Sequence, residues 1–117
     1  MLAALHGHRE VVRNLLIHGA QVNQAGWTPL MYASVDGDVS TSRLLLAYGA
    51  RVNAAADNGY TALMMAAREG HEALVAFLLA NGADVNQKTD SGATALSVAR
   101  ERKHEDIVNM LLKAGAL

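Results

Sequence analysis

The chain contains no cysteine, one proline, one tryptophan and one phenylalanine among its 117 residues. Without cysteine, a disulfide framework, a thiolate nucleophile and cysteine-ligated zinc are all excluded. An excess of charge of one sign is also lacking, because ten basic and eleven acidic side chains leave a net charge of -1. Nothing in the whole-chain charge therefore favours nucleic acid or an acidic membrane as a partner.

Long apolar runs are lacking too. No run approaches the roughly 18 residues of a membrane span, and no signal-peptide pattern opens the chain. We expect an intracellular protein, cytoplasmic or nuclear, without a membrane partner. Hydrophobic residues make up 51% of the chain and charged residues 18%, which is typical of one folded domain over residues 1–117. Few aromatics beside many alanines and leucines favour thin, closely stacked helices.

A repeat of 33 residues organises the sequence. Threonine recurs at this spacing and is followed each time by a small residue or proline and then leucine: Thr28-Pro29-Leu30, Thr61-Ala62-Leu63 and Thr94-Ala95-Leu96. A Gly-Ala pair keeps the same period at Gly49, Gly82 and Gly115, with an earlier copy at Gly19. Self-similarity at a fixed period indicates a repeat architecture.

The residue types predict two helices and a loop in each unit. Each repeated threonine can cap a helix, and Pro29 suits the first helical position. The helix that begins after Thr61 is expected to end at Gly70, and a second helix is expected over about 72–81. The segment 84–92 is expected to form an extended loop or short hairpin. One such unit is too thin to bury its apolar face, so the units must stack into a solenoid.

The pattern resembles that of ankyrin repeat proteins, a family with a 33-residue unit and a Thr-Pro-Leu, Ala-Ala, Leu-Leu and Gly-Ala-Asp-Val-Asn succession. The resemblance covers essentially the whole chain and implies an all-α solenoid of helix-turn-helix units with projecting loops or β-hairpin turns. We divide the chain into unit one (1–23, truncated), unit two (24–53, with a shortened loop), unit three (54–86) and unit four (87–117, a C-terminal capping repeat with Arg100 and Lys103 on its charged outer helix).

The departures from the family pattern leave alternatives open. Because unit one lacks its first helix start, the chain is either a piece of a longer array or has an open N-terminal face that pairs with another chain. An engineered binder is a third possibility. Thr41 and Ser42 replace apolar residues at positions that should face the core, so we expect the double change to valine to stabilise unit two. Lys103 stands where glycine is usual, in a conformation with positive φ, and Lys103→Gly should stabilise the chain.

The five histidines do not form an expected metal or catalytic site. His8, His71 and His104 occupy one position in three units, and stacked helices lie about 10 Å apart, too far to share a zinc ion. We expect each to bond the backbone of a neighbouring unit. No nucleophile elbow and no phosphate-binding glycine loop is present. We therefore expect no enzyme activity, no cofactor and no metal.

The resemblance implies a non-enzymatic module that binds a protein partner through a concave groove and the loop tips. Trp27 and Tyr60 each precede a capping threonine, so we expect them to be neighbours and binding hot spots. Tyr32 and Met65 share one position on the groove side, where surface and core are equally possible. The expected partner-binding residues are Trp27, Tyr60, Asp57, Asn58, Arg68, Glu69, Asp36, Tyr32, Met65, Asp90 and Ser91. We expect a monomer, with self-association through the N-terminal face as the alternative.

Three asparagines recur after the Gly-Ala pair: Asn23, Asn53 and Asn86. The resemblance implies that they tie adjacent loops together. Some family members are hydroxylated at such positions, and whether any of the three is modified stays open.

Overall fold

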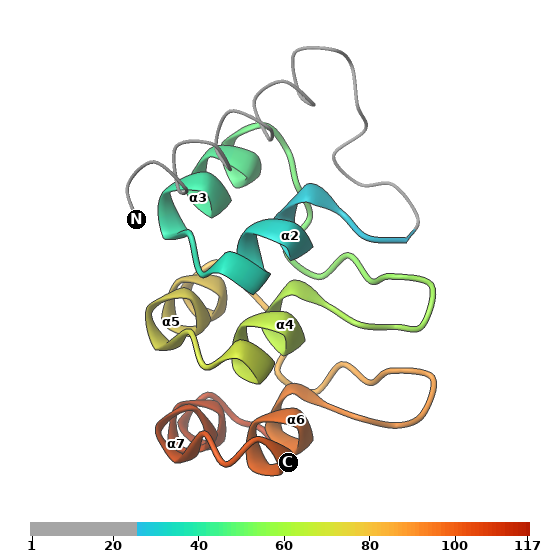
Figure 1. Ribbon diagram of the computed structural model, residues 1–117, viewed down its shortest axis with the longest axis vertical. Helices are drawn as coiled ribbons and strands as arrows, with labels where there is room; N and C mark the ends of the chain where they lie inside the picture. Colours follow the sequence, from blue (N-terminus) through green and yellow to red (C-terminus); the bar gives the residue numbers. More distant parts are fainter. Residues whose placement is uncertain (1–25) are drawn as a thin grey trace.

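The computed structural model of the chain describes residues 26–117. This part contains six helices: α2 (Pro29–Asp36), α3 (Val39–Ala47), α4 (Ala62–Glu69), α5 (Glu72–Ala80), α6 (Ala95–Glu101) and α7 (Glu105–Lys113). Figure 1 shows them as three antiparallel pairs stacked one on another, with α2, α4 and α6 in one layer and α3, α5 and α7 in the other. The loops before α4 and α6 project to the side of the first layer. The predicted all-α solenoid is confirmed.

Each first helix begins at the predicted threonine. The hydroxyl oxygens of Thr28, Thr61 and Thr94 accept hydrogen bonds from the backbone N–H three residues later, at 3.3, 3.3 and 3.2 Å. Pro29 occupies the first turn of α2, where no backbone donor is needed. These caps satisfy N–H groups that a short helix would otherwise leave without a partner.

The first helices end with a residue of positive φ. Gly37 and Gly70 take φ angles of 73° and 79° after α2 and α4. The equivalent residue after α6 is Lys103, with a φ of 61°, the one non-glycine residue of positive φ in the described part of the chain. The expected backbone conformation of Lys103 is therefore confirmed, and a side chain there carries a steric cost that glycine avoids.

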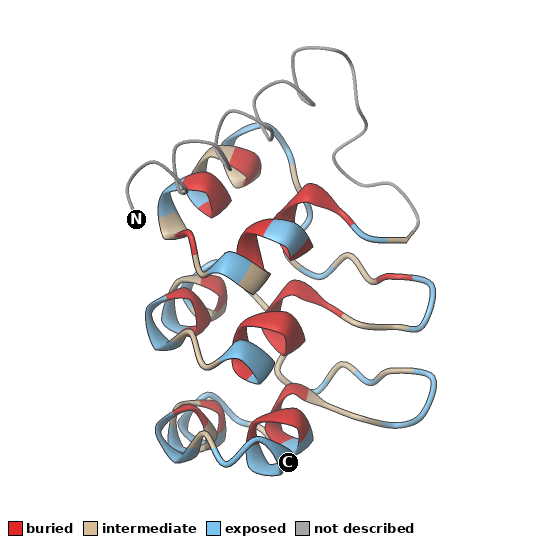
Figure 2. Cartoon of the chain, viewed as in Figure 1, coloured by how far each residue is buried: buried red, intermediate tan, exposed pale blue. Residues whose placement is uncertain are grey.

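The core fills the space between the two helix layers and between successive units. Leu63, Leu74 and Leu78 are fully buried there, and Met31 and Met64 are buried as expected. Figure 2 shows buried segments facing inward on the helices, while the loop ends are exposed. Because no unit could bury this surface alone, the stacking itself provides the stability.

Histidine and asparagine side chains tie successive units together, as expected. His71 Nε2 lies 2.7 Å from the Val35 carbonyl oxygen of the preceding unit, and His104 Nε2 lies 3.0 Å from that of Arg68. The His71 ring packs so closely over Gly37 that a Cβ there would lie 2.6 Å from its Nδ1. Asn53 donates to the Gly82 carbonyl and accepts from the Asp84 N–H. The histidines therefore serve the stack.

Unit two carries a buried polar cluster where unit three is apolar. Thr41 and Ser42 are buried, as predicted. The Ser42 hydroxyl donates to the Asp38 carbonyl at 2.9 Å, one turn earlier. The Thr41 hydroxyl, however, donates to the Asp38 carboxylate at 2.6 Å, and the Thr41 N–H also donates to that carboxylate at 3.1 Å. Since Asp38 is 6% exposed, Thr41 has a role that its replacement by valine would remove.

Some of the predictions lie outside the described residues. These are the predictions about unit one and its expected open N-terminal face, and, except for Gly26, the shortened loop from Asn23 to Gly26. The predictions about His8 and Asn23 lie outside them as well.

Candidate partner-binding surface

The loop-tip surface is formed by Asp57, Asn58, Asp90 and Ser91, all exposed. The two tips lie against each other, because the Asp90 N–H donates to the Asn58 carbonyl at 3.0 Å. The approach is close: a Cβ on Gly59 would lie 2.8 Å from Thr89 Cα, so glycine is required there. Figure 1 shows the two loops side by side.

Hydrogen bonds fix the shape of each tip. In unit three the Asn58 side chain accepts from the Tyr60 N–H at 3.1 Å, and the Ala56 N–H donates to the Tyr60 carbonyl at 2.8 Å. In unit four the Thr89 hydroxyl oxygen accepts from the Ala93 N–H at 3.0 Å. An ordered surface loses little conformational entropy when a partner binds.

An aromatic pair, Trp27 and Tyr32, is exposed on unit two. The ring centroids lie 5.0 Å apart and the ring planes are inclined by 50°. Trp27 remains 42% exposed and Tyr32 52% exposed. That Trp27 and Tyr60 are neighbours stays a prediction, whereas the ring that Trp27 contacts is that of Tyr32, on the helix that Trp27 precedes. The sequence contains one indication of this pair: Trp27 and Tyr32 are only five residues apart in a chain with few aromatic residues.

Tyr60 and Met65 occupy the same two positions in unit three but are covered. Tyr60 is half-buried and packs against a small cluster formed by Met31, Ala56 and Met65. Met65 is only 2% exposed. Met65 is therefore a core residue, and the expectation that it contacts a partner is wrong. It is covered because α2 contributes Met31 and the half-buried Val35 from the preceding unit, while the loop contributes Ala56.

The C-terminal ends of α2 and α4 carry three of the charged residues that we expected to contact a partner. Asp36, Arg68 and Glu69 are exposed, as a partner-binding role requires. Arg68 Nε and Glu69 Oε2 lie 3.6 Å apart, an exposed pair of small energetic value. Lys88, which is not among the expected binding residues, is also exposed and lies two residues before Asp90. The equivalent residue in unit three is the uncharged Ala55.

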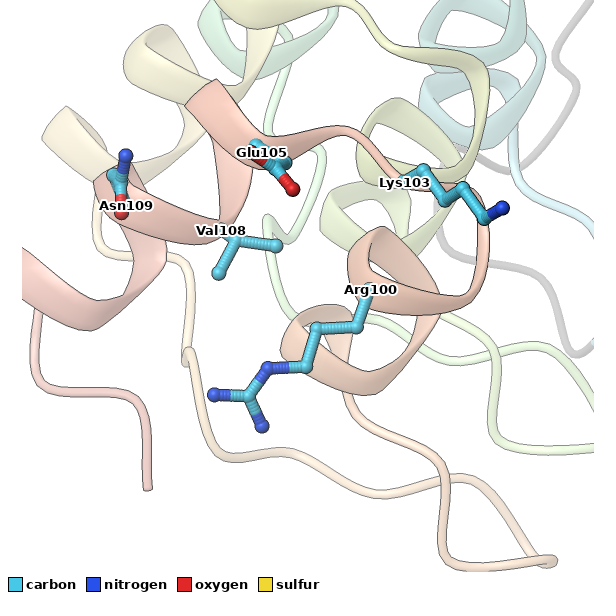
Figure 3. Close-up of a pocket in the computed structure, with 5 residues that line it drawn as sticks. All are labelled: Arg100, Lys103, Glu105, Val108 and Asn109. Carbon is cyan, nitrogen blue, oxygen red and sulfur yellow. The ribbon is translucent and has the colours of Figure 1, made fainter.

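A shallow hollow lies between α6 and α7, away from the loops. Figure 3 shows its lining residues, among them Arg100 near the end of α6, Lys103 in the segment after α6 and Val108 from α7. Arg100 takes the position of Ala67, which is fully buried against unit four, yet Arg100 is exposed. The predicted charged outer surface of unit four is thus present. Nothing in this hollow resembles a catalytic arrangement.

Within residues 26–117, no group of three or more histidine, aspartate or glutamate side chains is arranged to hold a metal ion. His71 and His104 are each engaged with a backbone carbonyl. No helix in the same range is both long and apolar enough to cross a membrane.

The chain belongs to the ankyrin repeat family. The family model described as ankyrin repeats (3 copies) matches residues 1–89 and 54–117, which together span the chain. The match agrees with the paired helices, the threonine caps and the projecting loops. The family points to a protein-protein interaction module.

Two curated relatives match part of the chain. They are the human and mouse proteins named protein phosphatase 1 regulatory subunit 27, each 42% identical over 66 residues. The match takes in 50% of this chain and 43% of each relative, so the chain spans less than half the length of the curated relatives it matches.

Proposed function

We propose that the chain is a non-enzymatic module that binds a partner protein through the aromatic pair, the loop-tip surface and the exposed ends of the first helices. The observation that carries the proposal is the exposed Trp27–Tyr32 pair. In a folded protein large aromatic rings are usually covered, and tryptophan and tyrosine are enriched among residues that dominate binding energy.

The loop-tip surface also supports this function. Asp57, Asn58, Asp90 and Ser91 form an ordered, exposed polar surface, and interfaces commonly combine an apolar centre with a polar rim. Because Met65 is buried, it cannot contribute to the apolar part of the proposed binding surface. That part is therefore confined to Trp27 and Tyr32 of unit two. We further propose that the chain acts as a monomer, for which light scattering at micromolar concentration is the test.

Regulation of a phosphatase is a second candidate. It is favoured by the 42% identity to protein phosphatase 1 regulatory subunit 27 over 66 residues. Calorimetric titration of purified protein phosphatase 1 with the chain tests it. Saturable binding that is lost on changing Trp27 and Tyr32 to alanine would support this candidate, whereas no heat of binding would remove it.

The principal test is affinity capture. The immobilised chain is compared with the Trp27→Ala/Tyr32→Ala variant and with Tyr48→Ala, and retained proteins are identified by mass spectrometry. Tyr48 is a matched control because it is 63% exposed and follows α3, in the layer away from the loops (Figure 1). Circular dichroism verifies that all three proteins are folded.

We expect a protein that is retained by the wild type and by Tyr48→Ala but lost from the double variant. Truncating hot-spot aromatic residues commonly weakens binding by at least about 2 kcal/mol. A protein retained equally by all three chains would place recognition elsewhere and contradict the proposal.

A further inference from the structure

The aromatic pair occupies the two positions of a hydrophobic staple at the start of α2. Trp27 lies just before the capping residue Thr28, and Tyr32 is the fourth residue of the helix. A contact between these two positions fixes the direction in which the chain enters a helix. In unit three the same positions hold the half-buried Tyr60 and the buried Met65. The pair in unit two is therefore held in place by its own helix, yet both of its rings stay exposed.

Two hydrogen-bond donors accompany the rings. Within residues 26–117, no hydrogen bond joins the Trp27 indole N–H or the Tyr32 hydroxyl to another protein group. An indole N–H can only donate, whereas a tyrosine hydroxyl can donate or accept. Because both side chains are exposed, the pair offers a ligand two ring faces and two donors at one place.

These properties match a proline-rich segment in the polyproline II conformation. Such a segment makes no internal hydrogen bonds, so its backbone carbonyl groups are free to accept from the two donors. Proline has no backbone N–H, so the segment brings few donors that would need an acceptor on this surface. Its conformation is already formed before binding, and its apolar rings suit aromatic surfaces. A helix, by contrast, uses its carbonyl groups internally.

We propose that the aromatic pair binds a proline-rich segment of a partner protein. Proline rings pack on Trp27 and Tyr32, and backbone carbonyls of the segment accept hydrogen bonds from the indole N–H and the tyrosine hydroxyl. The inference rests on the proposed function and specifies its partner. The single proline of these 117 residues, Pro29, is buried in the first turn of α2. A second copy of this sequence therefore does not supply the segment.

The single tryptophan of the chain makes the test direct. Because Trp27 is the only tryptophan, its emission reports on the aromatic pair alone. The probe is a short blocked polyproline peptide, compared with a blocked alanine–serine peptide of the same length. Each peptide is titrated to millimolar concentration while the emission is recorded, and calorimetry gives the dissociation constant.

We expect the polyproline peptide to change the emission saturably and the alanine–serine peptide to leave it unchanged. Tyr32→Phe keeps the ring and removes the hydroxyl, so it should weaken binding by about two- to tenfold. Trp27→Phe removes the indole donor and should weaken binding by at least as much, as measured by calorimetry. Tyr48→Phe, which removes an exposed hydroxyl directly after α3, should leave the dissociation constant unchanged.

The inference is overturned if the polyproline peptide does not bind or if the alanine–serine peptide binds equally well. It is also overturned if Tyr32→Phe and Trp27→Phe have no more effect than Tyr48→Phe. These results are separable from the affinity capture. A partner captured through Trp27 and Tyr32 that is neither displaced by polyproline nor sensitive to Tyr32→Phe would overturn the proline assignment and leave the proposed function standing. Polyproline binding without any captured protein would do the reverse.

Discussion

Units two and three follow the same backbone plan but treat equivalent positions differently. Unit three covers Met65 with side chains from α2 and its own loop, whereas Tyr32 and its neighbour Trp27 stay exposed on unit two. The second helix shows a contrast in the same direction: unit three buries the apolar Leu74 and Val75, while unit two buries the hydroxyl groups of Thr41 and Ser42. Unit three thus resembles a unit built for stability. Unit two has less of this apolar burial and carries the exposed Trp27–Tyr32 pair on which the proposed function rests.

The largest expected effect is a difference in stability between alanine variants of the equivalent residues Met65 and Tyr32. Met65→Ala should lower the free energy of unfolding by about 2–4 kcal/mol, because it empties a buried site. Tyr32→Ala should lower it by less than about 1 kcal/mol, since the ring is half exposed. Urea denaturation followed by circular dichroism measures both. Equal losses would mean that the two positions do not differ in burial, and the comparison would fail.

The next effect concerns the Thr41 hydroxyl. Thr41→Val removes a donor to the buried Asp38 carboxylate, which should lower the free energy of unfolding by about 1–3 kcal/mol. Thr41→Ser keeps the donor and is the matched control. From the sequence, we expected the double change of Thr41 and Ser42 to valine to stabilise unit two. The expected change in stability for Thr41→Val now has the opposite sign, because only the structure reveals the hydrogen bond to Asp38. A more stable Thr41→Val variant would show that this hydrogen bond is dispensable.

Ser42→Val should act in the opposite direction. The Asp38 carbonyl keeps the Ser42 backbone N–H as a donor, at 3.0 Å, so removal of the hydroxyl leaves it bonded. The added methyl groups enter a position where unit three buries Val75. Stability should rise by about 1 kcal/mol, measured as a higher midpoint of urea denaturation. A lower midpoint would indicate that unit two is too tightly packed to accept valine.

The smallest expected effect is at the end of α6. Lys103→Gly should raise the free energy of unfolding by up to about 1 kcal/mol, because the φ of 61° strains a residue with a Cβ. Arg102→Gly is the control: Arg102 has a φ of -89°, so glycine there should be destabilising. Thermal denaturation of the two variants should shift in opposite directions, and a shared direction would contradict the assignment.

Much of the fold could be predicted from the sequence because its determinants are local or repeated. The threonine caps, the glycine ends of α2 and α4 and the positive φ of Lys103 each depend on a few neighbouring residues. The bond of His71 to the preceding unit and the bonds of Asn53 to the next unit followed from the fixed places of these residues in the repeat. These features need no knowledge of side-chain packing.

The candidate surface was only partly predictable, because exposure depends on what the neighbouring unit supplies. Tyr32 and Met65 share a repeat position, and the sequence could not tell which of them is covered. The repeat spacing predicted Trp27 and Tyr60 as neighbours, but it did not reveal the ring contact between Trp27 and Tyr32 within unit two. The shorter distance between Asn23 and Gly26 than between Asn53 and Gly59 was the one signal that the surroundings of the two units differ.

The central claim is that a partner protein binds at the aromatic pair, and site-specific photocrosslinking tests it most directly. A benzophenone side chain is introduced in place of Tyr32 in one chain and in place of Tyr48 in another, and both are irradiated with the captured partner. We expect an adduct from position 32 and none from position 48. An adduct from position 48 alone, or equal adducts from both, would contradict it.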